Sequence, residues 1–204
     1  MLVRIEIAGP GAKARRLVFD DGGAPRETSA AAVKRLGIEE GTEVAREAVV
    51  AALSETEYGL AKERALRLLG YREHSAEELL RKLRDTGYPE AVAQAVVARF
   101  TEIELVDDAR FAAAWNRSRA AAGYGPRRIR RELEMRGVSP ETIRNALSDG
   151  EDSEDELARA LSALGGRTAA DRQGRDRLVR RLVSRGFALS VALRAVRASD
   201  IDED

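Results

Sequence analysis

Three segments of this chain share one pattern, in which two apolar residues four positions apart are followed, four positions further on, by a glycine. The triplets are Leu79, Leu83 and Gly87; Ile129, Leu133 and Gly137; and Leu178, Leu182 and Gly186. A four-residue spacing places both apolar side chains on one face of a helix, and glycine accepts the left-handed backbone conformation that ends many helices. Because successive triplets lie 50 and then 49 residues apart, we predict three stacked copies of one helical unit.

The composition agrees with a helical protein. Of the 204 residues, 44% are hydrophobic and only 4% are aromatic, so a core must consist mainly of leucine, valine and alanine. A core rich in leucine and alanine favours helices. We therefore predict a mainly α fold in which tandem three-helix repeats form an elongated curved array, with a small N-terminal α/β head of short strands.

Changes in pattern along the chain divide it into six segments. We predict a small α/β head at 1–58, helical repeat 1 at 59–108, helical repeat 2 at 109–148, an acidic linker at 149–156, helical repeat 3 at 157–199 and an acidic tail at 200–204. The first helix of repeat 3 is only faintly indicated, by Leu157, Ala160, Leu161 and Leu164.

Local signals place the elements of the head and of the first repeat. Alternation of apolar and polar residues predicts strands at 2–7 and 14–19, and Thr28 or Ser29 is suited to cap a following helix. From residue 43 to residue 69 the pattern predicts either one long helix or two shorter ones. Ser75 and Glu78 form a capping box at the start of a further helix.

Charge is segregated along the chain although the formal net charge is zero. Residues 109–147 carry 9 basic and 3 acidic side chains, and residues 157–199 carry 10 and 2. The stretches 149–156 and 200–204 carry 6 and 4 acidic side chains and no basic ones. Solvated helices need charges in any fold, but segregation on this scale predicts a polyanion or an acidic protein surface as partner.

No set of residues in the sequence resembles a catalytic or metal site. The chain has no cysteine and one histidine, so a His/Cys metal cluster cannot be assembled. A Ser-His-Asp triad would require His74, which lies in a polar turn before a helix cap and is not expected to be catalytic. Asp107 and Asp108 could serve acid–base chemistry or bind magnesium, but their position before a helical stretch favours capping of that helix. We expect no enzyme activity, no cofactor and no metal.

The sequence also carries no signal for a membrane. No apolar run reaches the roughly 20 residues that a membrane-spanning helix needs, and the N-terminus lacks the order of a signal peptide. The absence of cysteine is consistent with a reducing compartment. We expect a cytoplasmic protein with no membrane contact.

Arginine is concentrated at the start of the second repeat. Between residues 109 and 131 the only charged side chains are seven arginines, namely Arg110, Arg117, Arg119, Arg127, Arg128, Arg130 and Arg131. The last four cannot all share the buried face that carries Ile129 and Leu133, so they must reach solvent or a partner. A second basic surface is expected on the third repeat, at Arg177, Arg180, Arg181 and Arg185.

Three stretches of the sequence together resemble the RecX family of bacterial regulators of the RecA recombinase. They are HSAEELLRKL from residue 74, LVDDARFAAAW from residue 105 and GYGPRRIRRELEMRGV from residue 123. The resemblance covers about residues 60 to 147 and weakens over 156 to 197. It implies tandem three-helix repeats, and a protein that binds the RecA–DNA filament and suppresses its ATPase and strand-exchange activities.

The family's motifs coincide with residues that look structural in this chain. They are Asp107, Asp108, Arg110, Phe111 and Ala112, followed by Gly125, Ile129, Leu133 and Gly137. Trp115, the only tryptophan, is expected to pack between helices. The resemblance therefore leaves the eleven arginines named above, which we call the candidate arginines, as the expected contacts with a partner.

Our leading hypothesis is a RecX-like inhibitor that binds in the groove of the RecA filament as a monomer, with single- or double-stranded DNA phosphate as a further contact. It would act either by blocking the changes between RecA subunits that ATP turnover needs or by blocking entry of a second DNA. The alternative is a DNA-binding protein with helix-turn-helix-like units, in which residues 123–131 open a recognition helix. Sequence-specific binding of duplex DNA without any interaction with RecA would favour this alternative.

Overall fold

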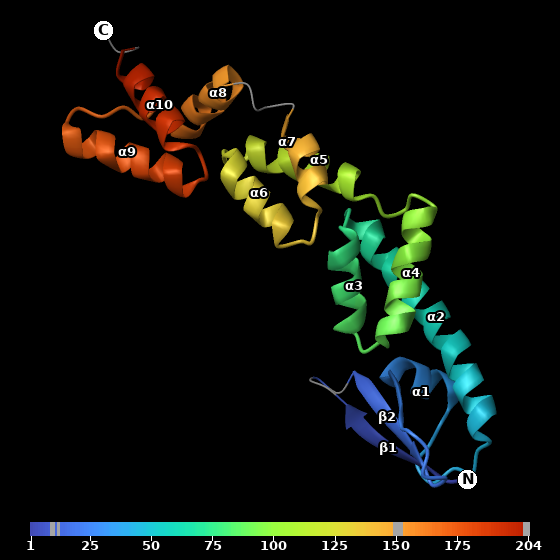
Figure 1. Cartoon of the computed structure of the whole chain (residues 1–204). Coiled ribbons are helices and arrows are strands. Elements are labelled where there is room, and N and C mark those ends of the chain that lie inside the picture. Colours follow the sequence, from blue (N-terminus) through green and yellow to red (C-terminus); the bar gives the residue numbers. More distant parts are fainter. Residues whose placement is uncertain (9–10, 12, 149–152, 202–204) are drawn as a thin grey trace. The chain divides into compact units, whose positions relative to one another are not determined.

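The computed structural model describes residues 1–8, 11, 13–148 and 153–201, and it divides into two compact units, Met1–Asp107 and Asp108–Asp204. Within the described residues the chain is mainly helical, with one three-stranded sheet near the N-terminus (Figure 1). The predicted mainly α fold with a small N-terminal α/β head is thereby confirmed. None of the described helices is both long enough and apolar enough to cross a bilayer.

The head contains an antiparallel sheet with the strand order β1-β2-β3. Its strands are β1 (Val3–Ala8), β2 (Ala14–Phe19) and β3 (Arg26–Ser29), and α1 (Ala30–Leu36) follows directly. The sequence did not predict β3, because its residues RETS lack apolar alternation. Ser29 ends this strand and also caps α1, since its hydroxyl accepts a hydrogen bond from the Ala32 amide at 3.1 Å.

A buried carboxylate joins the sheet to the next helix. The side chain of Glu57 is fully buried, and it accepts hydrogen bonds from the Thr28 hydroxyl at 2.5 Å and from the Ser29 amide at 3.1 Å. A guanidinium nitrogen of Arg26 lies 3.4 Å from its other oxygen. These partners replace the water that a buried carboxylate loses, and they fix β3 against the helix that carries Glu57.

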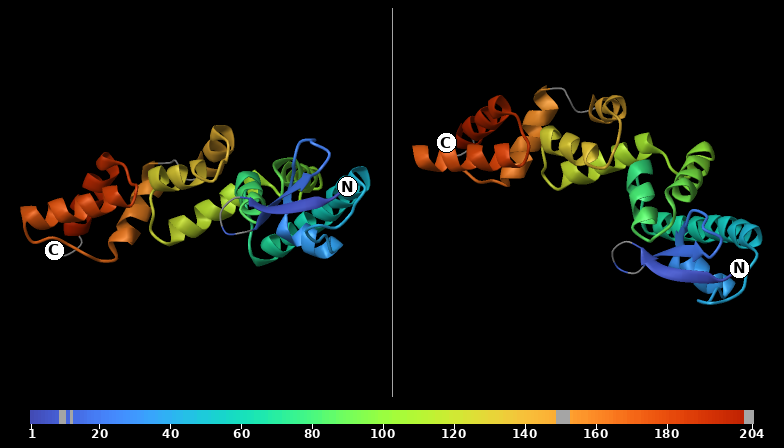
Figure 2. Two further views of the ribbon diagram at one scale, coloured as in Figure 1. Left: turned by 90° about the horizontal axis from the view of Figure 1, so that it is seen from below. Right: turned by 60° about the horizontal axis from the view of Figure 1, so that its bottom comes forward.

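That helix, α2, is continuous from Arg46 to Tyr71, which decides between the one-helix and two-helix readings of this stretch. Leu53, in its first half, packs in the core of the head, whereas Ala61 and Ala65, further along, pack in the core of the next bundle. The predicted boundary between residues 58 and 59 therefore lies inside one helix. In Figures 1 and 2 the sheet lies beside the N-terminal half of α2.

The second half of α2 forms a three-helix bundle with α3 (Ala76–Arg84) and α4 (Glu90–Glu102). Leu79, Leu83 and Phe100 are fully buried in its core. The Ser75 hydroxyl caps α3 by accepting from the Glu78 amide at 3.1 Å, as the capping box predicts.

The second unit contains two further groups of three helices. The first consists of α5 (Asp108–Ala121), α6 (Pro126–Glu134) and α7 (Pro140–Ser148), around a core that includes Phe111, Ile129 and Leu133. The second consists of α8 (Ser153–Leu164), α9 (Arg172–Ser184) and α10 (Leu189–Ile201), around a core that includes Leu182 and Phe187. Both views in Figure 2 show α9 and α10, in orange and red, side by side.

The predicted helix-ending glycines have the backbone angles that this role requires. The φ angles of Gly87, Gly137 and Gly186 are 96°, 75° and 97°, in a region that side chains with a Cβ rarely adopt. In the acidic stretches, residues 149–152 of the predicted linker and 202–204 of the predicted tail lie outside the described residues. The remainder of the predicted linker belongs to α8, and α10 extends to Ile201.

Candidate arginine surface

All eleven candidate arginines lie in the second unit, and ten of them are on three helices. Arg110, Arg117 and Arg119 are on α5, and four more are on α6, namely Arg127, Arg128, Arg130 and Arg131. Arg177, Arg180 and Arg181 are on α9, and Arg185 immediately follows that helix.

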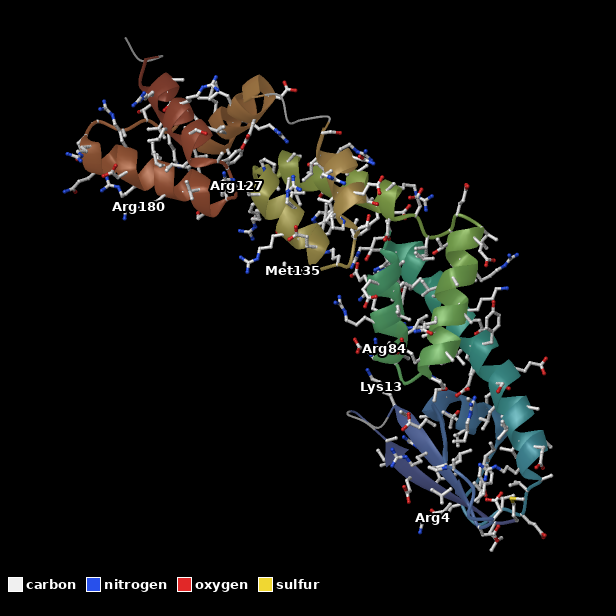
Figure 3. All side chains as sticks on the ribbon, viewed as in Figure 1. Arg4, Lys13, Arg84, Arg127, Met135 and Arg180 are labelled. Carbon is white, nitrogen blue, oxygen red and sulfur yellow. The ribbon has the colours of Figure 1, made fainter. Side chains whose placement is uncertain are left out.

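Three of these arginines line one groove between α6 and the C-terminal end of α9. The groove has a volume of about 390 Å³. Its lining residues are Arg127, Arg128, Arg131, Glu132, Met135, Val183, Ser184 and Gly186. We call it the α6–α9 groove. In Figure 3 the labelled Arg127 and Met135 lie at opposite ends of α6.

A backbone joint holds the two walls of the α6–α9 groove together. The Gly125 amide donates to the Arg185 carbonyl at 2.9 Å, and the Arg127 amide donates to the Gly186 carbonyl at 3.1 Å. A Cβ at Gly125 would lie 2.5 Å from the carbonyl carbon of Gly186, which is much closer than packed atoms approach. Glycine is therefore required at position 125 by the approach of a segment about 60 residues away, in addition to its place at the start of α6.

Glu132 organises the inner side of α6. Its carboxylate accepts hydrogen bonds from the indole N–H of Trp115 at 3.0 Å, from Arg119 Nε at 2.6 Å and from Arg128 Nε at 3.1 Å. Burial disfavours the charged carboxylate, but the bonds from Arg119 and Arg128 outweigh that effect and hold the pKa of Glu132 below its ordinary value. Glu132 thus stays ionised and fixes two of the candidate arginines.

Arginine side chains also cover the rings of Trp115 and Tyr124. The guanidinium of Arg136 lies 3.8 Å from the centre of the Trp115 ring, and that of Arg119 lies 4.7 Å from it. The guanidinium of Arg128 lies 4.3 Å from the centre of the Tyr124 ring. Such cation–π contacts restrict the arginines and leave the rings partly covered.

The other candidate arginines have different surroundings. Arg117 lines a separate groove beside α8, together with Asn116 and Asp155. Arg185 reaches back to the Gly123 carbonyl at 3.3 Å. Arg177 and Arg180 are exposed on α9, and Arg180 is labelled in Figure 3.

The remaining three, Arg110, Arg130 and Arg181, are not among the residues that line the α6–α9 groove. Arg110 is exposed near the start of α5, whereas Arg130 and Arg181 are half-buried. The candidate arginines therefore do not all share this groove.

Sequence reasoning missed Glu132, Tyr124 and Arg136. A usable signal existed for Glu132, since it follows Arg128 by four residues and directly precedes the buried Leu133. Its contacts with Trp115 and Arg119 cross from α6 to α5 and have no local signature. The hydrogen bond from the Trp115 indole N–H to this carboxylate was not predicted either.

The only histidine lies in the first unit and is buried. His74 Nδ1 is 3.2 Å from a carboxylate oxygen of Glu78, which also pairs with Arg72. Burial, and then the nearby charge of Arg72, lower the pKa of His74 below its ordinary value. Among the described residues no group of three or more histidine, aspartate or glutamate side chains is arranged to hold a metal ion.

Comparison with known proteins identifies two of the helical groups. Residues 61–100 match the family model described as RecX, first three-helix domain, and residues 107–147 match RecX, second three-helix domain. These ranges correspond to the bundle of α2, α3 and α4 and to the bundle of α5, α6 and α7.

Relatives that match about two thirds of this chain belong to the same family. Proteins named Regulatory protein RecX from Xanthomonas axonopodis pv. citri (strain 306) and from Stenotrophomonas maltophilia (strain R551-3) are 41% and 42% identical to this chain. The matches span 69% and 66% of this chain and 88% and 84% of the relatives. A crystal structure of regulatory protein RecX shares the fold, with a TM-score of 0.61 at 20% identity over 95% of this chain and 98% of that one.

Proposed function

This chain belongs to the RecX family, and from that premise we propose that it binds the RecA–DNA filament and lowers its activity through the arginines of its second unit. The observation that supports this most directly is the α6–α9 groove. Three arginines and one glutamate line it, and that glutamate is already bonded to Trp115 and Arg119. A cationic groove of this kind suits an anionic partner.

Two of the groove arginines are available for such a partner. Arg127 and Arg131 are exposed, and within the described part of the chain neither has an acidic group within 4 Å. Arg128, in contrast, is held by Glu132 and by the Tyr124 ring. We therefore assign partner contact mainly to Arg127 and Arg131, and a supporting role to Arg128.

Binding at this groove would inhibit RecA if the bound protein restrained neighbouring filament subunits or occupied the path of a second DNA. Either effect lowers ATP turnover or strand exchange without any chemistry on the part of this chain. The attraction is electrostatic, so both affinity and inhibition should weaken as salt rises.

The test is the ATPase activity of RecA on single-stranded DNA, measured with increasing amounts of this protein. We expect the natural chain to inhibit, and Arg127→Glu with Arg131→Glu to need at least about ten times more protein for half-inhibition, a loss of about 1.4 kcal/mol. The matched control is Arg144→Glu with Arg197→Glu, which reverses two exposed charges of the same unit outside the groove. Equal inhibition by both double variants would remove the groove from the mechanism.

A DNA-binding function is the second candidate, because the N-terminal end of α6 carries two exposed arginines on a short helix of a three-helix group. A gel-shift or anisotropy measurement with duplex DNA, without RecA, separates the two candidates. Sequence-specific binding to duplex DNA, together with no effect on RecA, would favour this second function.

A further inference from the structure

We propose that the α6–α9 groove takes an extended peptide segment with two acidic side chains and one apolar side chain at alternate positions. This inference rests on the proposed function, because it names the chemistry of the partner surface that would occupy the same groove. It starts from the order of the lining residues along α6.

Arg127, Arg131 and Met135 follow one another at four-residue spacing, so they form one stripe along α6. A helix rises 1.5 Å per residue, which places the two arginines about 6 Å apart along the axis and Met135 about 12 Å from Arg127. An extended peptide advances about 6.6 Å for every two residues, and alternate side chains point to one side. Acid-x-acid-x-apolar is therefore the extended sequence that matches arginine, arginine and methionine in turn.

The apolar end of the stripe is open to a ligand. Met135 is 60% exposed, and Val183, across the groove on α9, is 42% exposed. Met135 and Val183 therefore form an apolar surface at one end of the row of arginines. Such a surface suits an apolar side chain of a peptide whose neighbouring side chains are acidic. A flexible thioether adapts readily to such a partner.

The same residues do not suit nucleic acid as well. Proteins commonly hold single strands by stacking bases on aromatic rings, but arginines already cover Trp115 and Tyr124. The Trp115 indole N–H is also committed to Glu132. Met135 and Val183 offer phosphate neither charge nor hydrogen bonds. The mixture of charge and aliphatic surface therefore favours a peptide.

The groove is formed before any ligand arrives. Arg128 is fixed by Glu132 and Tyr124, and the hydrogen bonds from Gly125 and Arg127 to the end of α9 set the distance between the walls. Side chains that are already ordered in the free protein add less to the free-energy cost of binding.

The experiment is fluorescence anisotropy with the full chain and a labelled nonapeptide, Gly-Gly-Asp-Ser-Glu-Ser-Leu-Gly-Gly. A second peptide replaces Leu with Ser, and a third probe is a labelled oligonucleotide of thymidines. We expect saturable binding of the first peptide, and a dissociation constant at least about tenfold higher for the second. The oligonucleotide should compete poorly with the first peptide.

Variants assign the binding to the groove. Arg127→Ala with Arg131→Ala, and separately Met135→Ser with Val183→Ser, should each weaken binding of the first peptide about tenfold or more. Arg144→Ala with Arg197→Ala should stay within about twofold. All four groove positions are exposed, and circular dichroism verifies that each variant retains its helix content.

Three outcomes of the binding experiment would overturn the inference. They are equal affinity for both peptides, no saturable binding of either peptide, and an oligonucleotide that binds tightly through the arginines but ignores Met135→Ser with Val183→Ser. If the arginine variant loses inhibition of RecA while the Met135/Val183 variant inhibits normally, the peptide inference fails and the proposed function stands. If neither variant changes inhibition of RecA, both fail.

Discussion

Among the individual residues, Glu132 holds two of the candidate arginines by contacts within the protein, and it was not identified from the sequence. Eleven arginines were candidates, and Glu132 distinguishes Arg119 and Arg128, whose guanidinium groups it binds, from Arg127 and Arg131, which it does not bind. The identity of the arginines could be read from the sequence because a run of like charge beside buried residues must reach solvent. Their pairing could not, because it depends on contacts between α5 and α6 that no local pattern encodes.

Replacing Glu132 with Gln should destabilise the second unit by about 1–2 kcal/mol. The amide cannot neutralise Arg119 and Arg128, and the estimate allows for the partial exposure of both arginines. Trp115 is the only tryptophan and lies beside Glu132, so its fluorescence during urea unfolding reports directly on this unit. Glu134→Gln, an exposed substitution on the same helix, is the control. Indistinguishable midpoints for the two variants would contradict the role given to Glu132.

At the scale of elements, the repeated triplet predicted the helices that glycine ends, because helix periodicity and a left-handed terminus are local properties. The elements that the sequence missed or indicated weakly are those supported from elsewhere. Strand β3 has no apolar alternation and is held by its ladder with β2 and by Glu57 of α2. The contact between α6 and the end of α9 could not be predicted either, because Gly125 and Gly186 are about 60 residues apart in the sequence.

Two glycine substitutions should have opposite effects on stability. Gly125→Ala places a methyl group against the Gly186 backbone, so α6 and α9 must separate, and we expect a loss of about 1–3 kcal/mol. Gly59→Ala, in the interior of α2 with open space around the added carbon, should stabilise by about 0.5–1 kcal/mol because alanine favours helices. Urea unfolding followed by circular dichroism measures both changes. A Gly125→Ala chain as stable as the natural one would mean that the joint is not closely packed in solution.

At the scale of the whole molecule, charge follows the division into two units. Residues 1–107 carry 16 basic and 19 acidic side chains, and residues 108–204 carry 19 and 16. A total charge of zero therefore conceals net charges of −3 and +3 on the two units. The cores are also separate, so we expect the units to respond separately to conditions that act on one of them.

Mild acid should destabilise the first unit selectively. The pKa of His74 is lowered by burial below its ordinary 6.5, so the unfolded chain binds more protons than the folded one, and stability falls as the pH drops through this range. The second unit has no histidine, and the lowered pKa of Glu132 costs stability only below about its ordinary 4.5. When the pH is lowered from 7.5 to 5.5, thermal unfolding followed by circular dichroism should begin at a lower temperature. The midpoint temperature of the Trp115 fluorescence transition should not change.

A His74→Gln variant serves as the control for this experiment, because it should lose the pH dependence over the same interval. If the Trp115 transition shifts together with the circular dichroism signal, the two units unfold as one cooperative body.

Helix α2 gives the first unit a mechanical property of its own. With 26 residues it measures about 39 Å, and one end is anchored among the strands while the other is anchored among α3 and α4. The sheet and the bundle of α2, α3 and α4 are therefore joined through one continuous helix, and not through a loop that could bend between them.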